Sequence, residues 1–401
     1  MIRSFPLRLF LGLALGALAA AQQSAQPLAQ KPVEFKVGTW NLEFLGADGN
    51  FRNNLPNRDD KDLAAIGAKV RELGVCALAV QEVNDEAPLR KVAAGAGSNW
   101  DCLLGTSGEW DDKKTAQRIG FIWNAAEVEL LHCEELLHLP REFEGKPIFH
   151  RVPVTGVFRH RPTSCDFRLV TVHLKAGRKP DDEQKRRGES TLLAQWLDGL
   201  QQTDGEDQDI VLLGDFNCTY GTQPQQAFEA GKLRRWLTHA QPAPTIMHFP
   251  EPIDQVVVAD ACTEIQRGSL AVDGDFDGMD KDAWRKVYSD HFPVTVTLRA
   301  TGDDDASTFA QGPSNQALPV TRRGAAQAAP AAATTNGWPF VAGARVSLLG
   351  TEWITGTLLA DVPRNGEGWI TLMPDAPLHA RHATMAIVIH CATVARLVLT
   401  K

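Results

Sequence analysis

The chain of 401 residues has 41 Lys and Arg against 49 Asp and Glu, which gives a net charge of -8. This acidic balance excludes a protein that holds nucleic acid on a broad basic surface, because such binding comes from many Lys and Arg contacts to phosphate. Hydrophobic residues make up 43% of the sequence, which excludes a disordered chain and is enough for one large domain and a smaller one.

Residues 1–21 have the pattern of a secretory signal peptide. Arg3 and Arg8 precede an apolar stretch from Leu9 to Ala21, and the small residues at its end fit a cleavage site. A membrane anchor is the alternative, but the stretch is shorter than the roughly 20 apolar residues that a span needs. We therefore expect a secreted or periplasmic protein without an integral membrane anchor.

Seven cysteines stand at positions 76, 102, 133, 165, 218, 262 and 391. Export favours disulfides, whereas Cys76 and Cys165 lie in or beside apolar runs where a small buried thiol is an equal alternative. None has the Cys-x-x-Cys spacing of a zinc site. We expect no structural zinc.

Residues 33–300 are predicted to alternate strands with helices. The strands are expected at Glu34 to Trp40, Ala77 to Val80, Ile119 to Trp123, Phe167 to Leu174, Ile210 to Gly214 and Val256 to Val258. A first helix is predicted after a cap at Asp59 or Asp60, and a charged helix over Glu183 to Leu200. The apolar positions that define their buried faces are Leu63, Ile66, Val70 and Leu73 in the first helix and Leu192, Leu193, Trp196 and Leu197 in the second.

The C-terminal part of the chain has a different composition. Residues 301–336 are rich in Asp, Ser, Gln, Pro and Ala, which predicts a flexible linker. In residues 337–401, β-rich runs alternate with Gly, Pro, Asn and Asp. These runs are Arg345 to Leu349, Trp353 to Leu359, Trp369 to Met373, Met385 to His390 and Val394 to Leu399. We expect a small all-β, barrel-like domain there.

Polar side chains stand at the ends of several predicted strands. Asp215 and Asn217 are two apart after a buried run, so they leave its end pointing the same way. His173 ends another strand, and Asp290 and His291 stand before an apolar run. Each residue alone has a structural explanation as a turn residue or a core histidine. Together they supply what hydrolysis of a phosphoester needs, which is a cation, a base for water and donors for the developing charge.

Roles follow from the chemistry of each side chain. Hard cations take oxygen ligands, so Glu82 and Asp290 are predicted to hold Mg²⁺ or Mn²⁺, with Asn41 as a neutral oxygen ligand. The pair of Asp215 and Asn217 is left to orient water and phosphate. The imidazoles of His173 and His291 can serve as base, acid or cationic donor near neutral pH.

These segments resemble the endonuclease/exonuclease/phosphatase superfamily, which includes deoxyribonuclease I, and an exported bacterial-type member in particular. In the family's order, the matching segments are Thr39-Trp40-Asn41, Gln81-Glu82-Val83, Arg118-Ile119-Gly120-Phe121, Val172-His173-Leu174-Lys175, Gly214-Asp215-Phe216-Asn217, Ile253-Asp254-Gln255-Val256 and Ser289-Asp290-His291-Phe292-Pro293. They cover nearly all of residues 33–298. The resemblance implies an α/β fold, a four-layer sandwich of two packed β-sheets flanked by helices, with metal-dependent phosphoester cleavage.

The resemblance also implies roles for three further residues. Asp254 is expected to orient His291 and stabilise its charged form, as the acid of a triad does. Arg118 is expected to donate to the phosphate, with a surface ion pair as the alternative. Lys175 faces the same side as His173 and is expected either to touch a phosphate or to be a solvated lysine.

An acidic loop contains Asp273, Asp275 and Asp277 at alternate positions, which is how a calcium loop begins. Its twelfth position is Trp284 where such a loop has Glu. Bound Ca²⁺ and a solvated acidic loop are the two interpretations.

The leading hypothesis is a secreted nuclease that hydrolyses DNA, with RNA as a second substrate. Export argues against intracellular repair, and no aromatic loop suited to membrane contact stands out between the strands. A sphingomyelinase or another phospholipid or small-phosphoester phosphodiesterase is the alternative, followed by a non-catalytic binding protein. The C-terminal domain could bind nucleic acid, the cell envelope or a protein partner, since its tryptophans and arginines suit stacking and phosphate contacts, although core tryptophans are the favoured explanation.

Overall fold

The computed structural model describes residues 31–47, 55–110, 115–203, 205–230, 234–237, 243–305 and 316–318, and five strands between residues 345 and 399. The chain divides into two compact units, Met1–Ala326 and Gln327–Lys401. The expected signal peptide lies outside the described residues. Within these ranges, no helix combines the length and the apolar character that crossing a membrane requires.

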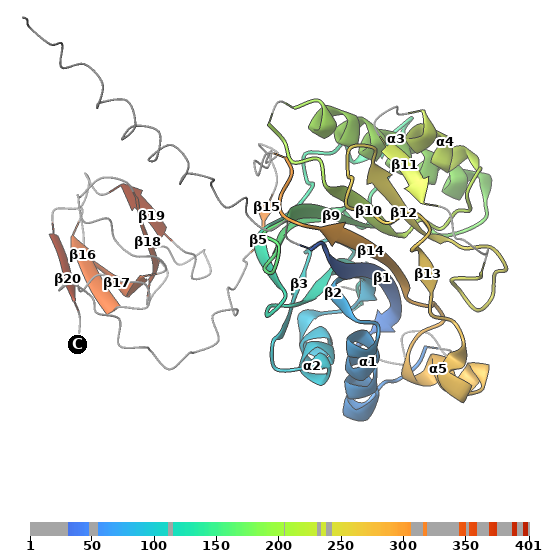
Figure 1. Cartoon of the computed structure of the whole chain (residues 1–401), viewed down its shortest axis with the longest axis horizontal. Coiled ribbons are helices and arrows are strands. Elements are labelled where there is room, and N and C mark those ends of the chain that lie inside the picture. Colours follow the sequence, from blue (N-terminus) through green and yellow to red (C-terminus); the bar gives the residue numbers. More distant parts are fainter. Residues whose placement is uncertain are drawn as a thin grey trace, which may run out of the picture. The chain divides into compact units, whose positions relative to one another are not determined.

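The larger unit contains two β-sheets packed face to face (Figure 1). The first has the order β13-β14-β1-β2-β4-β3, and the second β11-β12-β10-β9-β8-β5-β15. The strands of the first are β1 (Val33–Leu45), β2 (Val75–Val83), β3 (Trp100–Leu104), β4 (Arg118–Asn124), β13 (Ala271–Val272) and β14 (Val294–Ala300). Those of the second are β5 (Val128–Glu135), β8 (Val154–His160), β9 (Asp166–His173), β10 (Ile210–Asp215), β11 (Arg234–Leu237), β12 (Asp254–Ala259) and β15 (Gln316–Ala317). A separate hairpin joins β6 (Glu142–Phe143) to β7 (Lys146–Pro147).

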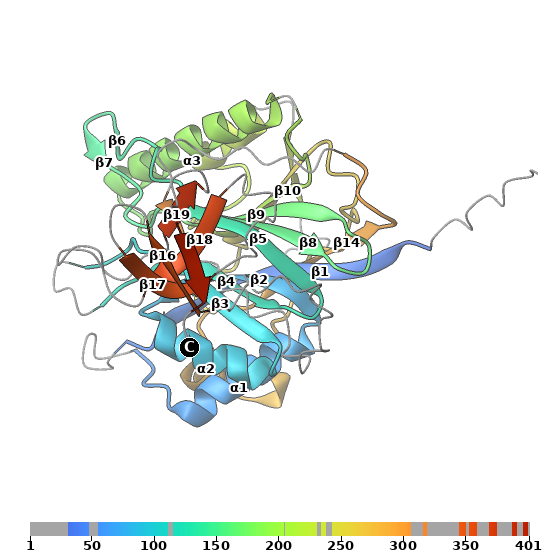
Figure 2. The same cartoon turned by 90° about the vertical axis from the view of Figure 1, so that its left-hand side faces the viewer.

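Helices cover the outer faces of both sheets, as Figure 2 shows from the side. The first sheet is covered by α1 (Asp60–Glu72) and α2 (Glu86–Ala96), and the second by α3 (Pro180–Gln201) and α4 (Gln223–Glu229). A short helix, α5 (Lys281–Val287), precedes β14. The four-layer α/β sandwich predicted from the sequence is therefore confirmed.

Helix α1 illustrates why the predicted elements form. The Asp59 carboxylate caps it by accepting the backbone N–H groups of Lys61 and Asp62, which otherwise have no partner in the first turn. Its buried Ile66 and Val70 belong to the apolar layer between the helices and the first sheet. A larger layer fills the space between the sheets. No disulfide joins the six cysteines within the described ranges, and all six are buried.

Two strand pairs set the position of the polar residues. Among the described strands, β1 pairs with β2 and β9 with β10 in parallel, whereas the other pairs are antiparallel. The ends of the parallel pairs place Asn41 beside Gln81, and Asp215 beside His173. Polar ends of adjacent parallel strands meet at one edge of a sheet. The packed sheets bring both edges together.

The segment after β14 departs from the expected linker over residues 301–336. Gln316–Ala317 pairs with β5 as an edge strand. Before it, Asp303 accepts a hydrogen bond from the backbone N–H of Asp166, and Asp305 from that of Gln208. Edge pairing uses main-chain groups that any residue carries, so composition does not reveal it. The described part of this segment lies against the larger unit.

The second unit contains one antiparallel sheet in the order β19-β18-β17-β16-β20. Its strands are β16 (Arg345–Leu349), β17 (Trp353–Leu358), β18 (Trp369–Pro374), β19 (Ile387–His390) and β20 (Arg396–Leu399). Each lies within or next to a run that the sequence predicted as β-rich. The binding role considered for this unit stays a prediction.

Candidate active site

Asp215, the last residue of β10, lies at the centre of a buried polar cluster. Its Oδ2 accepts a hydrogen bond from Asn41 Nδ2 at 3.0 Å, and the same oxygen lies 3.4 Å from His173 Nε2 and 3.8 Å from His291 Nε2. Its Oδ1 accepts the backbone N–H of Asn217 at 2.9 Å. Residues far apart in the sequence, on both sheets, therefore converge on one carboxylate.

The residue before Asp215 must be glycine. Gly214 has a φ of +146°, and a Cβ added to it would stand 2.1 Å from the backbone oxygen of Val172 on the neighbouring strand. Non-glycine residues rarely adopt this conformation, and the close approach would force β9 and β10 apart. In the sequence Gly-Asp-Phe-Asn, the backbone conformation therefore requires the glycine, and the chemistry of the site requires the aspartate.

His291 is held by a second carboxylate. Its Nδ1 donates to Asp254 Oδ2 at 2.9 Å, and Asp254 is itself fixed by its backbone N–H, which donates to Thr245 Oγ1 at 3.0 Å. Burial by itself lowers the pKa of His291, but Asp254 and then Asp215 outweigh it and raise that pKa well above its usual value. His291 is therefore an imidazolium near neutral pH, with its Nε2 directed at Asp215.

The pKa of His173 is shifted in the opposite direction from that of His291. Its Nε2 lies 3.6 Å from Glu82 Oε1, and its Nδ1 is buried without a hydrogen-bond partner. Burial, with the nearby guanidinium of Arg151 next in importance, lowers the pKa of His173 well below its usual value. This imidazole is therefore neutral. The two histidines of the cluster are set for different tasks, which the sequence alone left open.

The carboxylates predicted to hold a metal lie at the same edge. Glu82 has a φ of +56°, in the left-handed region that a glutamate rarely adopts, and its side chain is 13% exposed. Burial first, and then the charge of Asp290, raise the pKa of Glu82 to about 7. Burial likewise raises the pKa of Asp215 to about 6. A carboxylate whose ionisation is opposed by burial and by a neighbouring charge is a fitting ligand for a divalent cation, which would offset that charge.

The Asn41 amide connects these groups. While its Nδ2 donates to Asp215, its Oδ1 accepts the backbone N–H of Glu43 at 3.0 Å, and its backbone oxygen accepts Ser289 Oγ at 2.7 Å. The same Ser289 hydroxyl accepts the backbone N–H of His291. Asn41 is completely buried. It therefore aligns Asp215 in addition to any oxygen contact it offers to a metal.

Sequence reasoning missed Glu43. One of its carboxylate oxygens accepts the backbone N–H of Asp290 at 3.1 Å, and the other accepts Arg285 Nε at 2.7 Å. The guanidinium of Arg58 lies 3.4 Å away and is almost fully buried. Burial, followed by the charge of Asp290, raises the pKa of Glu43, while the arginines oppose that rise. Its place two residues after Asn41 on one strand is the sequence signal that could have found it.

Both cations predicted to bind phosphate form ion pairs with nearby carboxylates. The Arg118 guanidinium forms an ion pair with Glu109 at 2.5 Å and donates to the Asn84 carbonyl. Lys175 Nζ forms an ion pair with Asp182 at 2.8 Å. These contacts favour the surface ion pair that was the alternative for Arg118, and they give Lys175 an aspartate partner in place of a solvated position.

A buried arginine underlies the cluster instead. Arg151 donates from Nε to the His173 carbonyl at 3.1 Å and from a terminal nitrogen to the Leu174 carbonyl at 2.7 Å. Its position before β8, far in sequence from the strand end that it supports, carries no local signal. Burial lowers the pKa of Arg151, with the charges of Glu189, Glu82 and Asp215 opposing that effect.

The acidic loop considered for calcium contains an ammonium group. Lys69 Nζ lies 2.9 Å from Asp273 Oδ2 and 2.8 Å from Asp277 Oδ2, and the lysine side chain is only 2% exposed. The carboxylates of Asp273, Asp275 and Asp277 are close enough to one another to hold an ion. Lys69 already supplies the counter-charge, however, which favours the interpretation without calcium.

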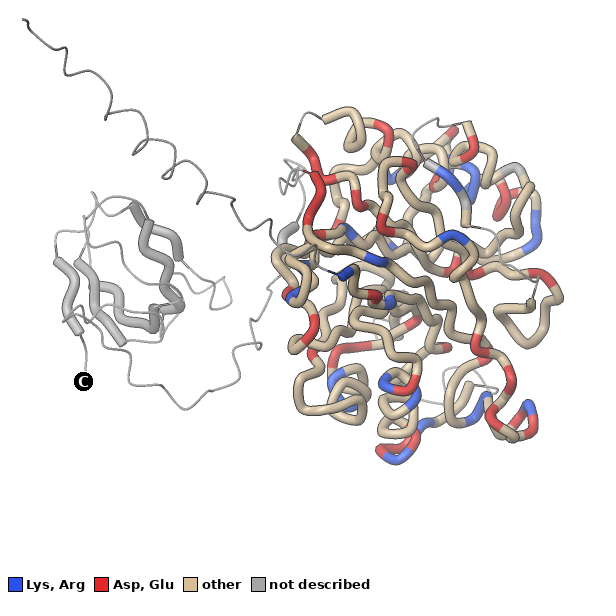
Figure 3. The backbone as a smooth tube through the Cα atoms, in the orientation of Figure 1, with Lys and Arg blue, Asp and Glu red and all other residues tan. Residues whose placement is uncertain are grey.

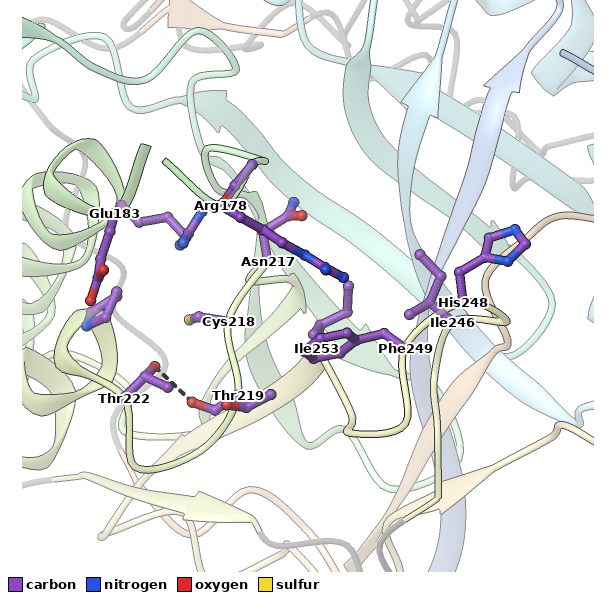
Figure 4. A pocket seen from close by; sticks show the side chains of 13 residues that line it. Arg178, Glu183, Asn217, Cys218, Thr219, Thr222, Ile246, His248, Phe249 and Ile253 are labelled. Atoms are coloured by element: carbon purple, nitrogen blue, oxygen red, sulfur yellow. Dashed lines mark hydrogen bonds between the residues drawn. The ribbon is translucent and has the colours of Figure 1, made fainter. Parts of the chain in front are cut away.

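A pocket of about 520 Å³ adjoins the cluster at Asn217 (Figure 4). Its wall includes Ile246 and Ile253, and the Arg178 guanidinium lies 5.3 Å from the centre of the Phe249 ring. Figure 4 shows Arg178 extending across the pocket toward Phe249. A flat cation over an aromatic ring, beside apolar side chains, suits a planar group attached to an anion.

Similar proteins share much of this chain. Endonuclease/exonuclease/phosphatase family domain-containing protein 1 of Bos taurus is 25% identical over 303 residues, and the human protein of that name is 24% identical over 303 residues. Each match covers 68% of this chain and 50% of the relative, so the chain spans about half the length of these curated relatives. A solved endonuclease/exonuclease/phosphatase structure from Bacteroides vulgatus has 16% identity and a TM-score of 0.49, covering 66% of this chain and 98% of its own.

The family assignment rests on the match to a family model. The family model described as Endonuclease/Exonuclease/phosphatase family matches residues 38–291, which is more than half of the chain. This range begins within β1 and ends at His291, so it contains every member of the buried cluster around Asp215. The chain belongs to the endonuclease/exonuclease/phosphatase family, whose members are hydrolases that include nucleases and phosphatases.

Proposed function

We propose that this protein is a divalent-metal-dependent phosphodiesterase that cleaves nucleic acid, DNA foremost and RNA as a second substrate, by attack of water on phosphorus. One observation carries the proposal. Asp215 lies between a neutral His173 and a charged His291, at the edge where burial and the charge of Asp290 raise the pKa of Glu82. A carboxylate to hold water, a cationic donor and a metal-binding pair are the parts that such hydrolysis requires.

The metal would be held by Glu82 and Asp290, with Asn41 beside them. Family members generally use divalent metals, and Mg²⁺ or Mn²⁺ suits an oxygen ligand set. When bound, the ion would supply positive charge to the phosphoryl oxygens. This charge matters because the phosphodiester itself repels an approaching hydroxide.

The chain's own groups divide the remaining work. Asp215, fixed by Asn41 and the Asn217 backbone, orients the attacking water and is the group placed to accept its proton. The His291 imidazolium donates to a phosphoryl oxygen or to the leaving oxygen, and Asp254 keeps it charged. His173, which is neutral, supports Asp215 without adding a competing positive charge.

The adjoining pocket supports a nucleic acid substrate. Its Arg178–Phe249 pair presents a flat guanidinium and an aromatic face, which are surfaces on which nucleobases stack. A volume of about 520 Å³ accommodates a nucleotide unit. Asn217 is common to the pocket and the cluster. A base seated there would leave its phosphate near Asp215.

A lipid surface fits the described residues less well. The exposed large hydrophobic side chains within the described ranges are Val33, Leu137 and Tyr220. Lys and Arg are interspersed with Asp and Glu along the larger unit (Figure 3). Binding to a bilayer needs a larger apolar patch or a concentrated basic surface. Sphingomyelin and other phospholipids therefore rank second as substrates.

Export is part of the proposal. Arg3 and Arg8 followed by the apolar stretch from Leu9 to Ala21 support a cleaved signal peptide. Fractionation of cells that express the full chain, with N-terminal sequencing of the product, tests it. A mature protein beginning near Gln22 outside the cytoplasm is the expected result, and full-length protein in the cytoplasm contradicts export.

The central experiment measures release of acid-soluble nucleotides from duplex DNA, single-stranded DNA and RNA. Wild type is expected to cleave DNA with Mg²⁺ and to stop when a chelator is added. Asp215→Asn keeps the size of the side chain and should lose activity, whereas Asp260→Asn, at an exposed position, should retain it. Sphingomyelin vesicles and small phosphate monoesters are tested in parallel. If the protein turns over only sphingomyelin or the monoesters, and not nucleic acid, the proposal of a nuclease is contradicted.

The pocket offers a separate test of substrate class. Arg178→Gln and Phe249→Ala should raise KM for DNA roughly tenfold, because stacking on one base contributes about 1–3 kcal/mol. Both variants should leave cleavage of bis(p-nitrophenyl) phosphate unchanged, since that compound has no nucleobase. Equal losses on both substrates would show that the pocket supports the site structurally rather than binding a base.

A further inference from the structure

A second cluster of acidic and thiol groups lies at the other ends of the strands that carry the active site. Asp166 begins β9 and Asp209 immediately precedes β10, whereas His173 and Asp215 end those two strands. The length of the strands separates the two clusters by on the order of 20 Å. Neither the proposed reaction nor the pocket uses these groups.

The members of this acidic cluster lie within a few ångströms of one another. Ligand atoms of Asp166, Asp207 and Asp303 are within 4.8 Å of one another, and so are those of Asp209, Cys262 and Glu264. Cys165 Sγ lies 3.6 Å from Asp209 Oδ2. The residues come from β9, the turn before β10, the turn after β12 and the segment after β14. Groups so distant in sequence do not assemble through local loop chemistry.

The cluster buries charge that the described residues do not balance. Asp207 is 0% exposed, Asp209 1% and Glu264 6%. Arg159 donates to both carboxylate oxygens of Asp166, at 2.6 and 2.7 Å, but no Lys, Arg or His within the described ranges forms an ion pair with Asp207, Asp209 or Glu264. Burying ionised carboxylates without a counter-charge is strongly unfavourable. A bound cation or bound protons must offset them.

One atom points to a ligand. Asp207 Oδ1 accepts the backbone N–H of Asp209 at 2.9 Å, whereas Asp207 Oδ2 is buried and has no hydrogen-bond partner. Burial, with the charges of Asp305 and Asp303 adding to it, raises the pKa of Asp207 to about 8. A fully buried carboxylate oxygen without a partner is rare, because leaving it unsatisfied forfeits its hydration. A bound cation would supply the missing partner.

We propose that this acidic cluster binds a divalent cation that prefers oxygen ligands, with Asp166, Asp207 and Asp303 as its carboxylate ligands. Calcium–oxygen distances of about 2.3–2.6 Å place two ligands of one ion at most about 5 Å apart, which the three carboxylates satisfy. The thiols argue against zinc, because burial raises the pKa of Cys165 and Cys262 and keeps both protonated.

The cation would join three segments that are remote in sequence. Asp303 belongs to the segment that follows β14 and continues to the edge strand β15, while Asp166 and Asp207 stand at the starts of two central strands of the second sheet. Binding would hold that segment against the sheet and raise the resistance of the larger unit to unfolding. The expected effect is on stability and not on the chemical step.

The experiment measures thermal unfolding and calcium calorimetry on the full chain carrying Glu82→Gln, which removes a ligand of the proposed catalytic metal. With CaCl₂ at a hundredfold excess over Kd, the Tm should rise by roughly 5 °C relative to chelator. Adding Asp207→Asn should abolish both the shift and the calorimetric signal. Adding Asp60→Asn instead, an exposed change on α1, should leave both intact.

Three results would overturn the site. The first is a Tm that calcium does not change, together with no heat of binding. The second is a shift that persists in Asp207→Asn, which would move binding to another set of carboxylates such as the loop of Asp273. The third is a Tm of Asp207→Asn that exceeds that of the parent chain by the same amount with and without calcium. That result would mean that the cluster holds protons and no cation. If Asp207→Asn does not fold, Asp303→Asn gives the same readings at a carboxylate nearer the chain surface.

Discussion

His291 Nδ1 lies 2.9 Å from Asp254 Oδ2, and this buried contact determines which histidine of the site is charged. His173 has no carboxylate hydrogen-bonded to its Nδ1, which is buried without a partner. Burial and then the charge of Arg151 lower the pKa of His173, while Asp254 and then Asp215 raise that of His291. The two imidazoles beside Asp215 differ because only His291 has a carboxylate hydrogen-bonded to its Nδ1.

Replacement of Asp254 tests this division of charge. Asp254→Asn should lower kcat roughly 10²- to 10⁴-fold, because an amide cannot stabilise the His291 imidazolium. The pKa of His291, measured by NMR, should fall in the variant. Asp260→Asn provides the matched exposed control. A variant with normal kcat would remove Asp254 from the mechanism.

The pH dependence of the metal-free protein follows from Glu82. Its pKa of about 7 in the folded chain lies above the value of 4.5 expected when unfolded, so the folded state binds the proton more tightly. The stabilisation is complete below about pH 4.5 and is lost as the pH rises through about 7. Urea unfolding with chelator should show decreasing stability from about pH 5 to about pH 8, and Glu82→Gln should reduce that slope.

Metal affinity should change in the other direction. Protons and the cation compete for the Glu82 and Asp215 carboxylates, so Mg²⁺ should bind more tightly as the pH rises from about 5.5 to about 8. Isothermal titration calorimetry measures this affinity, and the heat should show that protons are released. An affinity independent of pH would place the metal on other ligands.

Glu43→Gln tests the buried ion pairs behind Asp290. The change leaves Arg58 buried without its counter-charge and should lower the free energy of unfolding by roughly 3–5 kcal/mol. It should also weaken metal binding, because the Asp290 backbone loses its carboxylate partner. Glu86→Gln breaks an exposed pair with Arg90 and should cost less than about 1 kcal/mol. Urea unfolding of both variants makes the comparison.

Gly214→Ala should disrupt the site through the backbone alone. The new methyl group would meet the Val172 carbonyl, so the variant should lose activity and unfold at a Tm several degrees lower than wild type. Gly199→Ala is the matched control, because its added Cβ meets no atom within 4 Å in helix α3. That control should be stabilised by about 0.5–1 kcal/mol. Equal behaviour of the two variants would contradict the backbone argument.

Sequence patterns reveal features that depend on neighbouring residues along the chain, and they reveal little about contacts that form only on tertiary packing. Asp215 and His291 stand beside apolar strands, and Asp254 directly precedes one, so local pattern and family resemblance singled out residues that the structure brings together. The partners of Arg118 and Lys175 could not be identified from the sequence, because the direction of a long side chain depends on tertiary neighbours such as Glu109 and Asp182.

The supporting charges escaped prediction for a related reason. Arg151 acts through backbone carbonyls of a strand end that lies more than twenty positions later in the sequence. Its two carbonyl partners have no side-chain identity that a sequence pattern could show. The edge strand Gln316–Ala317 is similar, because it joins β5 through main-chain groups. Such contacts follow from tertiary packing and leave no local mark.

The parallel pairs β1–β2 and β9–β10 have a consequence for how activity is lost. The first pair supplies Asn41 and Glu82 from one sheet, and the second supplies His173 and Asp215 from the other. Residual turnover during heating therefore reports whether the sheets are still stacked, even while each retains its strands. On heating, activity should be lost at a lower temperature than the far-ultraviolet circular dichroism signal. Activity requires the two sheets to be packed together, whereas the signal requires only the secondary structure of each.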